Sequence, residues 1–335
     1  MANLLKKPLH VVEKKKFWFI GSGALILIGL LVIAIFGLNL GIDFTGGATL
    51  NVNTGAYIEV SDENAHEVRD IVTEALKKQG LEAVTIQKSG SGAVAGYEFK
   101  MQLKLHGKEV SDTEFFDAID AVKAELQNSL VAIDGIDSVE ITSSASGATA
   151  TAQLVSSTMW ALALAIVLIL IYVMIRFTFT SAIAAVIALM HDVLVMLAVC
   201  AICRVQINTY FIAAILTIVG YSINNTIIIF DRVRENKKIY PDLSDTDLVN
   251  TSLTEMFNRM IHTTVTTLLV MVVLVIVGVA SIREFGIPII VGLVSGAYSA
   301  TCIAGPMWTV LQKAAKKIKS KKQKSYRGKK ADQAE

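Results

Sequence analysis

Six apolar stretches of roughly 20 residues constrain the fold of this chain more than any other feature. A helix rises about 1.5 Å per residue, so about 20 apolar residues cross the hydrocarbon core of a bilayer. With 53% hydrophobic and 18% charged residues, the chain is also far more apolar than soluble proteins. We predict a polytopic α-helical membrane protein with six transmembrane helices, at residues 17–38, 159–175, 181–202, 210–230, 263–279 and 285–310.

Lysine and arginine residues gather on one side of the predicted membrane. Basic clusters precede the first span, separate the fourth span from the fifth, and follow the sixth. By the positive-inside rule, residues 1–16 and 312–335, and therefore both termini, are expected to be cytoplasmic. The first apolar run is too long for a signal peptide and lacks an A-x-A-like cleavage site, so it is expected to remain as an anchor. The basic tail is expected to contact lipid headgroups, with a nucleic-acid or ribosome contact as the alternative.

Residues 39–155, between the first two spans, form a polar segment that is expected to be extracytoplasmic. From position 37 to position 155 there are 18 acidic and 8 basic residues. Strands and amphipathic helices alternate in the order βαββαβ, which predicts an inserted α+β ferredoxin-like domain with an antiparallel sheet. Ser61 is the expected N-cap of the first helix, Gly80 is its expected end, and the second helix is capped as well. The remaining bundle is expected to occupy residues 156–311.

Enzymatic chemistry and bound cofactors are not expected. His66 and His106 of the outer segment are isolated, and no protease, hydrolase or phosphate-binding motif is visible. Cys200 and Cys203 form a C-x-x-C, but they lie in an apolar stretch without further ligands, which favours packing over metal or redox chemistry. A binding or force-transmitting role therefore fits the outer domain better than catalysis.

Asp192 is the most unusual residue of the predicted third span. It lies about 16 Å along the helix, near the bilayer midplane. A carboxylate there costs at least about 2.5–3.5 kcal/mol, so a function or a fixed partner is expected. The functional hypothesis is that Asp192 takes up a proton from one side and releases it to the other. The alternative is permanent pairing with Asn224, Tyr221 or an arginine of a partner subunit, and adjacent His191 is expected to point away.

Polar residues also interrupt the fourth span. Two neighbouring stripes at helical spacing carry them: Thr217, Tyr221, Asn224 and Asp231, and Ser222 with Asn225. Together the stripes are predicted to face the interior of the bundle. At the cytoplasmic end of the span, Arg232 or Arg234 is expected to pair with Asp231 and gate the inner mouth. Basic anchors that snorkel to the membrane surface are the alternative.

Two glycine patterns indicate close backbone contacts. Gly292 and Gly296 form a G-x-x-x-G in the sixth span, which predicts a helix-packing seam within the subunit or against a partner. After the first span, a pair of glycines in "GLNLGIDFTGGATL" suits a tight turn from the membrane helix into the first strand. This turn motif comprises Gly41, Asp43, Gly46 and Gly47.

These segments together resemble the SecF family of bacterial protein-export membrane subunits, a branch of the SecD/SecF proteins within the RND superfamily. The resemblance extends from Gly41 to about Trp308. It is carried, in order, by "GLNLGIDFTGGATL", "IALMHDVLV", "FIAAILTIVGYSINNTIIIFDRVREN", "TTVTTLLV", "GIPIIVGLVSGAYSA" and "IAGPMW". It implies an RND-like half in the bacterial cell membrane that pairs with SecD beside the SecYEG channel and the SecA ATPase. YajC and YidC are further partners that the resemblance suggests.

The resemblance implies that the subunit uses the ion-motive force to complete the export of unfolded preproteins. It marks Asp192, Asp231 and Arg232 as ion-coupling candidates, with Asn224 and Asn225 beside them. The family usually has aspartate where this chain has Asn225, so we expect protons to be coupled through Asp192, with Na⁺ as the alternative. A small-molecule or lipid exporter of the same superfamily is the rival function, against which the single six-span half argues. A third possible function is that of a passive scaffold.

Overall fold

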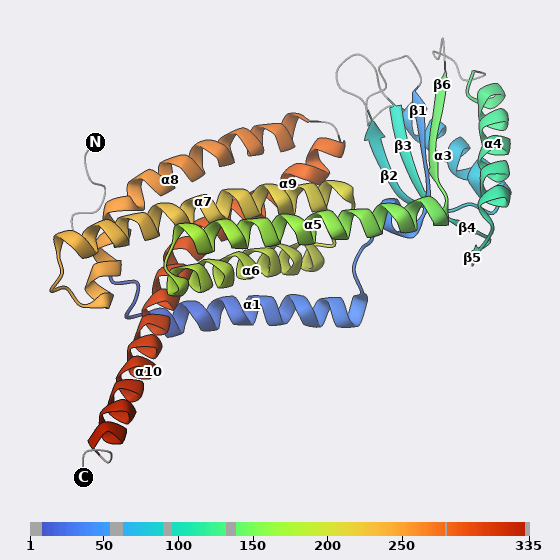
Figure 1. Ribbon diagram of the computed structural model, residues 1–335. Helices are drawn as coiled ribbons and strands as arrows, with labels where there is room; N and C mark the ends of the chain where they lie inside the picture. The colour runs from blue at the N-terminus through green and yellow to red at the C-terminus, as the bar shows by residue number, and fades with distance from the viewer. Residues whose placement is uncertain (1–8, 54–62, 90–95, 132–138, 279, 332–335) are drawn as a thin grey trace.

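The computed structural model describes residues 9–53, 63–89, 96–131, 139–278 and 280–331. A long helical bundle carries a sheet domain at one end (Figure 1). Within the described residues, six helices are long and apolar enough to cross a membrane, which confirms the predicted spans. They are α1 (Lys15–Phe36), α5 (Ala148–Arg176), α6 (Phe179–Ile202), α7 (Thr209–Ile239), α8 (Asp245–Val277), and the continuous pair of α9 (Ala280–Ser299) and α10 (Gly305–Ala331).

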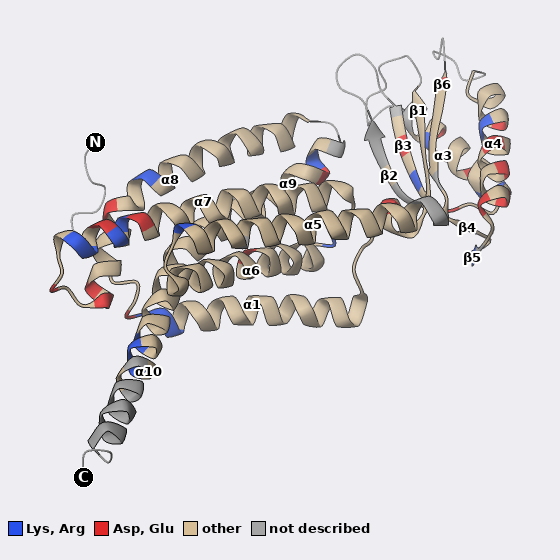
Figure 2. Cartoon of the chain, viewed as in Figure 1, with Lys and Arg blue, Asp and Glu red and all other residues tan. Residues whose placement is uncertain are grey.

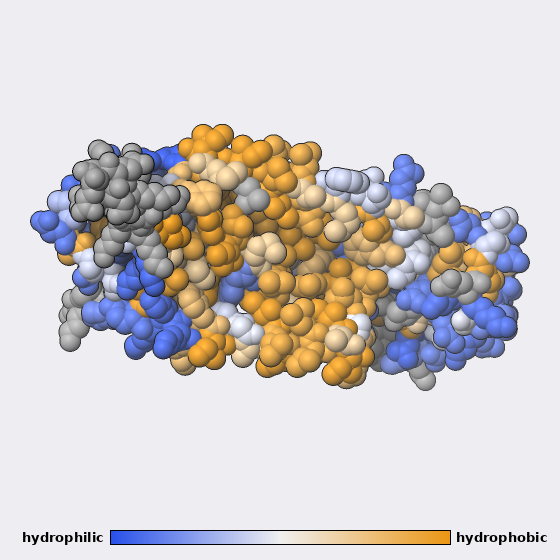
Figure 3. Space-filling view, turned by 60° about the horizontal axis from the view of Figure 1, so that its bottom comes forward, coloured by the Kyte–Doolittle hydropathy of each residue, from blue (hydrophilic) through white to orange (hydrophobic). Residues whose placement is uncertain are grey.

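Helices α6, α7 and α9 form the centre of the described bundle. About half or more of the apolar stretch of α6 (56%), α7 (50%) and the joined α9 and α10 (61%) is buried, against 11% or less for α1, α5 and α8. The outer helices expose many large aliphatic side chains, and an apolar belt crosses the middle of the face shown in Figure 3. Such a belt between two hydrophilic ends is typical of contact with lipid.

The sixth span contains a change of helix type. Helix α9 ends at Ser299, the π-helical turn η1 (Ala300–Ala304) follows, and α10 continues to Ala331. The predicted span ended at residue 310, but the helix runs on into the basic tail. Lysine and arginine are good helix formers, so the tail stays helical after its apolar residues end. There, Lys316 Nζ lies 2.6 Å from Asp245 Oδ2 in the first turn of α8.

The sheet domain lies between α1 and α5 in the chain. Among the described residues, a four-stranded antiparallel sheet has the order β2-β3-β1-β6. Its apolar face packs against the two helices through residues such as Leu50, Phe99 and Phe115. The elements are α2 (Ile42–Thr45), β1 (Gly47–Asn53), α3 (Glu63–Lys78), β2 (Ala83–Ser89), β3 (Gly96–Gln102), a ribbon of β4 (Lys104–Leu105) and β5 (Lys108–Glu109), α4 (Asp112–Ser129) and β6 (Glu140–Ser146).

Local signals in the sequence explain the ends of the domain's helices. Ser111 caps α4 through a capping box with Glu114, in which each side chain bonds the backbone amide of the other. Gly80 follows α3 with a φ of +72°, a conformation that glycine adopts without strain, as predicted. Ser61, the predicted cap of α3, lies outside the described residues. The small β4 and β5 ribbon was not predicted, because its strands have only two residues each.

The two connections between the sheet domain and the bundle lie side by side. Strand β1 pairs with β6 so that Gly47, where the chain enters the sheet, is opposite Ser146, where it leaves. Helix α5 begins two residues later, at Ala148. Charged residues gather in the sheet domain and at the far end of the bundle, where α1 begins and where α7 ends and α8 begins (Figure 2).

Candidate functional site

Asp192 lies between the three central helices, with 1% of its side chain exposed. Ser222 of α7 and Ser299 of α9 donate hydrogen bonds to its Oδ2 at 2.5 and 2.6 Å. Ser295 of α9 donates to its Oδ1 at 2.7 Å. His191 Nδ1 lies 3.1 Å from the same Oδ1. We call these five residues the Asp192 cluster.

Small residues let α7 and α9 approach closely enough to form this cluster. A Cβ on Gly292 would lie 2.4 Å from Ile218 Cγ1, and a Cβ on Gly296 would lie 3.3 Å from Ser222 Cβ. The glycine pattern therefore lies at the contact between α7 and α9 of this chain. The two serines of α9 are four residues apart, so they share one face of the helix and reach the same carboxylate.

The chemistry of the cluster suits a group that changes its charge. A carboxylate accepts hydrogen bonds only, and three hydroxyl donors with an imidazole satisfy it away from water. A hydroxyl can also accept, so a serine that rotates its hydrogen can take a bond from a protonated Asp192. The cluster therefore accommodates both protonation states without movement of the backbone. In a membrane span, where an unpaired charge is costly, this is a condition for reversible proton binding.

The alternative in which Asp192 pairs with Asn224 or Tyr221 was wrong, whereas pairing with an arginine of a partner subunit stays a prediction. Its carboxylate takes its bonds from serines rather than from Asn224 or Tyr221. His191, expected to point away, also contacts Asp192 and stacks on Tyr298 with ring centroids 5.8 Å apart. Side chains of consecutive residues on a helix point about 100° apart. The imidazole of His191 is nevertheless long enough for its Nδ1 to reach the adjacent carboxylate.

The polar residues of α7 do not all face the interior, contrary to the prediction. Ser222 and Asn225 are buried, with 0% and 1% exposure, whereas Thr217 and Asn224 are exposed on the outside of this chain. Tyr221, on the same predicted stripe as Thr217 and Asn224, is partly buried and bonds Thr264 of α8 at 3.4 Å. Within the described part of the chain, Asn225 Nδ2 has no hydrogen-bond partner. Asn225 thus lies inside the bundle without joining the Asp192 cluster.

Within the described residues Asp231 pairs with neither Arg232 nor Arg234, so the predicted pairing was wrong, and the gating role stays a prediction. Asp231 lies 3.2 Å from Arg176 of α5, and Arg232 binds Glu255 of α8 and Glu235 of its own helix at 2.6 Å each. Adjacent helical residues point about 100° apart, which sends the two side chains to different neighbours. Asp231 is nine residues beyond the cluster's serine on α7, about 14 Å along the axis, so the structure does not bring it to Asp192.

The turn motif attaches the sheet domain to the start of α7. The amide of Gly41 donates to the carbonyl of Ile207 at 2.7 Å. Asp43 Oδ2 accepts from the amide of Thr209 at 2.8 Å, in the first turn of α7. An acidic group is favourable there, because the first amides of a helix lack partners within it.

The paired glycines fit their positions closely. Gly46 has a φ of +74° and Gly47 a φ of +150°. A Cβ on Gly47 would lie 2.0 Å from the carbonyl oxygen of Met101 on strand β3. A side chain is therefore excluded by both conformation and space, which explains the glycine pair at the start of the sheet.

A buried polar contact that the sequence did not predict joins the sheet domain to the bundle. Lys100 of β3 lies 2.5 Å from Glu284 of α9 and 3.4 Å from Glu98. Asn208, the cap of α7, donates to the other oxygen of Glu284 at 2.5 Å. Lys100, Glu284 and Asn208 are 8%, 9% and 4% exposed. We call these four residues the junction cluster.

The junction cluster borders a polar cavity of about 280 Å³ between the sheet and the bundle. Burial alone lowers the pKa of Lys100, but the carboxylates of Glu284 and Glu98 outweigh it and hold this pKa above its usual value of 10.5. Lysine is therefore charged at neutral pH even though it is buried. Lys100 and Glu284 are 184 positions apart, so only the placement of the domain brings them together.

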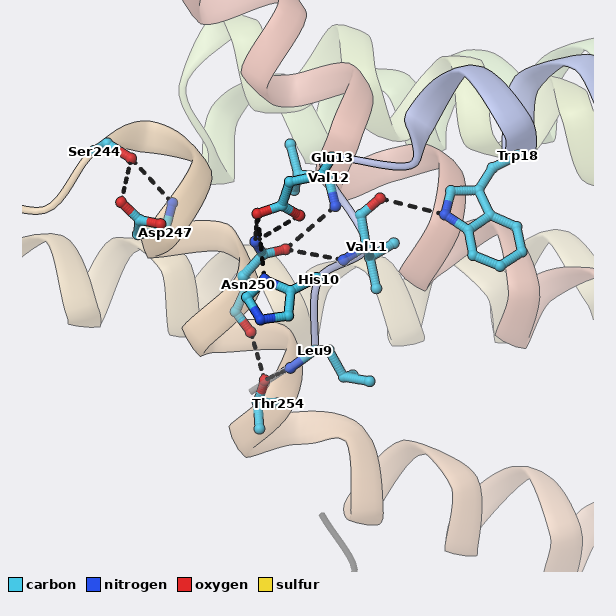
Figure 4. Close-up of polar contacts among 10 residues, drawn as sticks. All are labelled: Leu9, His10, Val11, Val12, Glu13, Trp18, Ser244, Asp247, Asn250 and Thr254. Atoms are coloured by element: carbon cyan, nitrogen blue, oxygen red, sulfur yellow. Dashed lines mark hydrogen bonds and ion pairs between the residues drawn. The ribbon is translucent and has the colours of Figure 1, made fainter. Parts of the chain in front are cut away.

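The N-terminal strap, residues 9–13, is fixed to the start of α8 by one asparagine (Figure 4). Asn250 Oδ1 accepts from the amides of Val11 and Val12, both at 3.2 Å, and its Nδ2 donates to Glu13 at 2.9 and 3.1 Å. Trp18 Nε1 donates to the carbonyl of Val11 at 3.2 Å. Asn250 thus uses both ends of its amide to bind the strap, a contact between residues about 240 positions apart that was not predicted.

We expect Asn250→Ala to release the strap. The variant removes four hydrogen bonds and leaves buried amides without acceptors, which costs about 2–4 kcal/mol of the strap's attachment. Trp18 reports the release by fluorescence when Trp160 and Trp308 are replaced by phenylalanine. Thr254→Val, which removes the bond to the amide of Leu9 and a bond within α8 to the carbonyl of Asn250 but leaves the amide of Asn250 in place, is the graded control. An unchanged spectrum for Asn250→Ala would contradict this role.

The strap should also loosen in acid. Burial raises the pKa of Glu13, but hydrogen bonds from its own backbone amide, Asn250 and His10 outweigh this and keep the pKa below the usual 4.5. Because this pKa is lowered, the contribution of Glu13 to the strap's attachment is complete above pH 4.5 and is lost as the pH falls below it. We therefore expect the Trp18 signal to change below pH 4.5 in the wild type. In Glu13→Gln this step should be absent.

The fold and site define a multi-pass membrane protein that holds a serine-bound carboxylate inside its bundle and carries an inserted sheet domain. Models of two families match it: the SecD/SecF GG motif over residues 31–54 and the C-terminal part of the protein export membrane proteins SecD and SecF over residues 125–314. The chain belongs to the SecF family of protein translocase subunits.

Relatives of known name support this assignment. The protein translocase subunit SecF of Sebaldella termitidis is 35% identical over 94% of this chain and 95% of its own length. That of Alicyclobacillus acidocaldarius is 33% identical over 91% and 93%. The crystal structure of SecDF from Thermus thermophilus, described as a translocon-associated membrane protein, superposes with a TM-score of 0.72 at 27% identity. The match covers 95% of this chain and 40% of that one.

Proposed function

We propose that this chain is the accessory SecF-type subunit of a Sec translocase, and that it uses proton flow through Asp192 to drive the late export of unfolded preproteins. SecD and the SecYEG channel are the partners in this proposal. The observation that carries it is the buried Asp192 cluster, which lies where three central helices meet. A change of charge there alters hydrogen bonds to two helices at once, which is a direct way to couple ion binding to helix movement.

The cluster favours a proton over Na⁺ as the coupling ion. All three serine hydroxyls donate to the carboxylate. A proton needs only the rotation of one hydroxyl, whereas a sodium ion needs oxygen lone pairs and would have to replace these hydrogen bonds. Asn225 holds an amide inside the bundle but does not touch the carboxylate, which leaves Asp192 as the titrating group of the proposed path.

We further propose the membrane orientation. The basic residues of α10 and of the last turn of α7, Lys237 and Lys238, lie at the end of the bundle away from the sheet domain (Figure 2). By the positive-inside rule that end is cytoplasmic, with both termini, and the sheet domain is extracytoplasmic. The corresponding regions are 1–16, the first span at 17–38, the outer domain at 39–155, the helical bundle at 156–311 and the tail at 312–335.

The outer domain is proposed to be ferredoxin-like. Its described elements follow the order βαββαβ apart from the small ribbon, and its strands lie in the order β2-β3-β1-β6. In a βαββαβ chain this order places the first and third strands at the centre with both helices on one face. The other face is polar and borders the junction cluster, which suits a domain that moves against the bundle.

An exposed face of α7 supports pairing with a SecD-type subunit. Thr217, Gly220 and Asn224 lie on this face at a spacing of three and four residues, inside an apolar span. Polar and small residues at the surface of a membrane helix are typical of contact with another helix rather than with lipid. The single face therefore offers a docking seam for the partner's helices.

Gly220→Trp should prevent this pairing. A side chain on Gly220 meets nothing within 4 Å in this chain, so the substitution changes only what approaches from outside. We expect at least a tenfold loss of SecD in co-purification at equal membrane level. Gly23→Trp on α1, where the space is equally open, is the matched control and should keep the partner. Equal recovery of SecD with both variants would place the seam elsewhere.

The proposed function is tested by rescue. Cells depleted of their own SecF receive this chain with its cognate SecD, and export of a signal-bearing reporter is followed by pulse-chase. We expect the stalled export intermediates of the depleted cells to disappear. If the pair inserts and assembles but export stays slow, the export function is wrong and the exporter alternative gains support.

A further inference from the structure

Tyr298 of α9 contacts both the Asp192 cluster and α1. Its ring stacks on that of His191, with centroids 5.8 Å apart and an angle of 28° between the planes. Its hydroxyl donates to the carbonyl of Trp18 at 2.9 Å and accepts from Ser22 Oγ at 3.0 Å. We call Trp18, Ser22, His191 and Tyr298 the Tyr298 link. Because His191 also contacts Asp192, the link forms a continuous series of contacts from the buried carboxylate to α1.

The link holds the part of α1 that lies apart from α6. At Gly29 the two helices are in close contact, since a Cβ there would lie 2.2 Å from Ala198 Cβ. About two turns earlier, a Cβ on Gly21 would meet nothing within 4 Å, and a cavity of about 550 Å³ lies between α1, α6 and α9. The start of α1 is therefore attached to α9 through Tyr298, beside a space that gives it room to move about the contact at Gly29.

The charge of Asp192 determines how firmly the imidazole of His191 is held. Among the described contacts of Asp192, His191 is the titratable group, and the others are serine hydroxyls of α7 and α9. A carboxylate only accepts, so His191 Nδ1 donates to it. A hydrogen bond to a charged acceptor is about twice as strong as one between neutral groups, so protonation of Asp192 weakens this bond. Within the described residues His191 Nε2 has no hydrogen-bond partner that could replace it.

Tyr298 is placed so that a change at His191 reaches α1. Its hydroxyl both donates and accepts a hydrogen bond, which fixes the oxygen against α1. Trp18 and Ser22 are four residues apart and share one face of that helix, so both bonds change when the ring shifts. Trp18 also donates to the carbonyl of Val11 in the strap. The other end of α1 leads into the sheet domain, so a displacement of α1 affects both ends of the molecule.

We propose that Tyr298 is a positioning residue that couples the charge of Asp192 to the position of α1. While Asp192 is charged, the imidazole is fixed and the link holds the start of α1 to α9. When Asp192 is protonated, the stack loosens and the start of α1 moves about the contact at Gly29. The role of this movement in export rests on the proposed function, in which it would shift the first connection of the outer domain in each proton cycle. The coupling itself is a property of this chain.

The experiment measures the position of α1 in the purified full chain in nanodiscs at neutral pH. Spin labels are placed at Phe17 of α1 and Ile175 of α5, two exposed residues, and their distance is measured by pulsed electron paramagnetic resonance. The native cysteines are replaced by alanine at Cys200, Cys203 and Cys302. We expect Asp192→Asn to broaden the distance distribution and to shift its mean by about 1–2 Å, the usual size of helix shifts.

Three variants test the route of the coupling. Tyr298→Phe keeps the stack but loses both bonds to α1, so its distribution should be the same with and without Asp192→Asn. His191→Phe keeps the bonds of Tyr298 to α1 but loses the bond to Asp192, so it should also abolish the difference. Tyr221→Phe, which removes a hydroxyl bond between α7 and α8, is the matched control and should retain it. A Tyr298 that only held the helices together would leave the effect of Asp192→Asn intact in His191→Phe, and this result would overturn the proposal, as would the absence of any effect of Asp192→Asn.

Export of a reporter separates this inference from the proposed function. If Asp192→Asn stops export but leaves the distance unchanged, the coupling through Tyr298 is wrong and the proposed function stands. If the distance responds to Asp192→Asn through Tyr298 while export proceeds normally, the coupling stands and the role of Asp192 in export is wrong.

Discussion

Asp192→Asn is expected to reduce export to the rate of cells without the subunit, while the chain still inserts and binds SecD. Asparagine matches the shape of aspartate, and the surrounding hydroxyls of Ser222, Ser295 and Ser299 can rotate to bond its amide. Packing of the central helices should therefore be retained. The variant loses the change of charge. Without that change, proton binding no longer shifts the equilibrium between two arrangements of the helices.

Pulse-chase export with matched membrane levels measures this effect. Asp231→Asn is the appropriate comparison, because it removes a carboxylate that is partly exposed and paired with Arg176 at the edge of the bundle. Exposed ion pairs contribute about 0–1 kcal/mol, so its effect on export should be small. If Asp192→Asn rescues fully, the proton path does not include this carboxylate and the energy enters through the partner. If Asp231→Asn is equally defective, the inner edge must be part of the path.

Lys100→Met is expected to weaken the attachment of the sheet domain to the bundle by about 3–5 kcal/mol. The substitution removes the cation from a buried pair and leaves the charge of Glu284 with less compensation, which is costly away from water. Hydrogen exchange of purified protein should increase in β3 and in the first turns of α9, the two segments that the contact joins. Export should slow as well if the domain transmits movement.

The matched control is Lys78→Met in the same domain. Lys78 pairs with Glu125 at 2.9 Å, but its side chain is 56% exposed, so its loss should hardly matter. Lys100→Met combined with Glu284→Leu should recover much of the attachment, because an apolar pair of similar size replaces the buried ions. Equal exchange in the Lys100 and Lys78 variants would show that the junction cluster contributes nothing.

The raised pKa of Lys100 sets the pH range of this contact. A group whose pKa is higher in the folded state stabilises that state fully below its ordinary pKa and loses this effect as the pH rises above it. For Lys100 the ordinary pKa is 10.5, so its contribution to the attachment of the domain is lost only above that pH. The attachment of the domain should therefore be constant through the neutral range. Any change in domain position between pH 6 and 8 would have to come from other groups.

The membrane spans could be predicted from the sequence because the bilayer imposes a length. The first span, predicted at 17–38, is the helix Lys15–Phe36, and the third ends at Ile202 as predicted. The fourth was underestimated: the helix runs to Ile239, because a polar helix can continue in water beyond the apolar run. Hydropathy detects the lipid boundary and not the end of the helix.

The partners of the charged residues could not be predicted in the same way. Asp192 was identified by its cost in lipid, but its serines lie 30, 103 and 107 positions away and depend on how three helices pack. The spacing of Ser295 and Ser299 beside the glycine pattern was the one available signal. Pairing of Asp231 with Arg232 failed because proximity in sequence is not proximity on a helix. The junction cluster could not be predicted because its residues meet only when the whole sheet domain is placed against the bundle.

The neighbouring positions of Gly47 and Ser146 have a mechanical consequence. The sheet is attached to the bundle at both, through α2 on one side and directly into α5 on the other. A rigid body held at two points keeps one degree of freedom, rotation about the line that joins them. The sheet domain is therefore expected to rotate about this line when the junction cluster opens, rather than to slide or twist, and the pair of Lys100 and Glu284 opposes this rotation while it is formed.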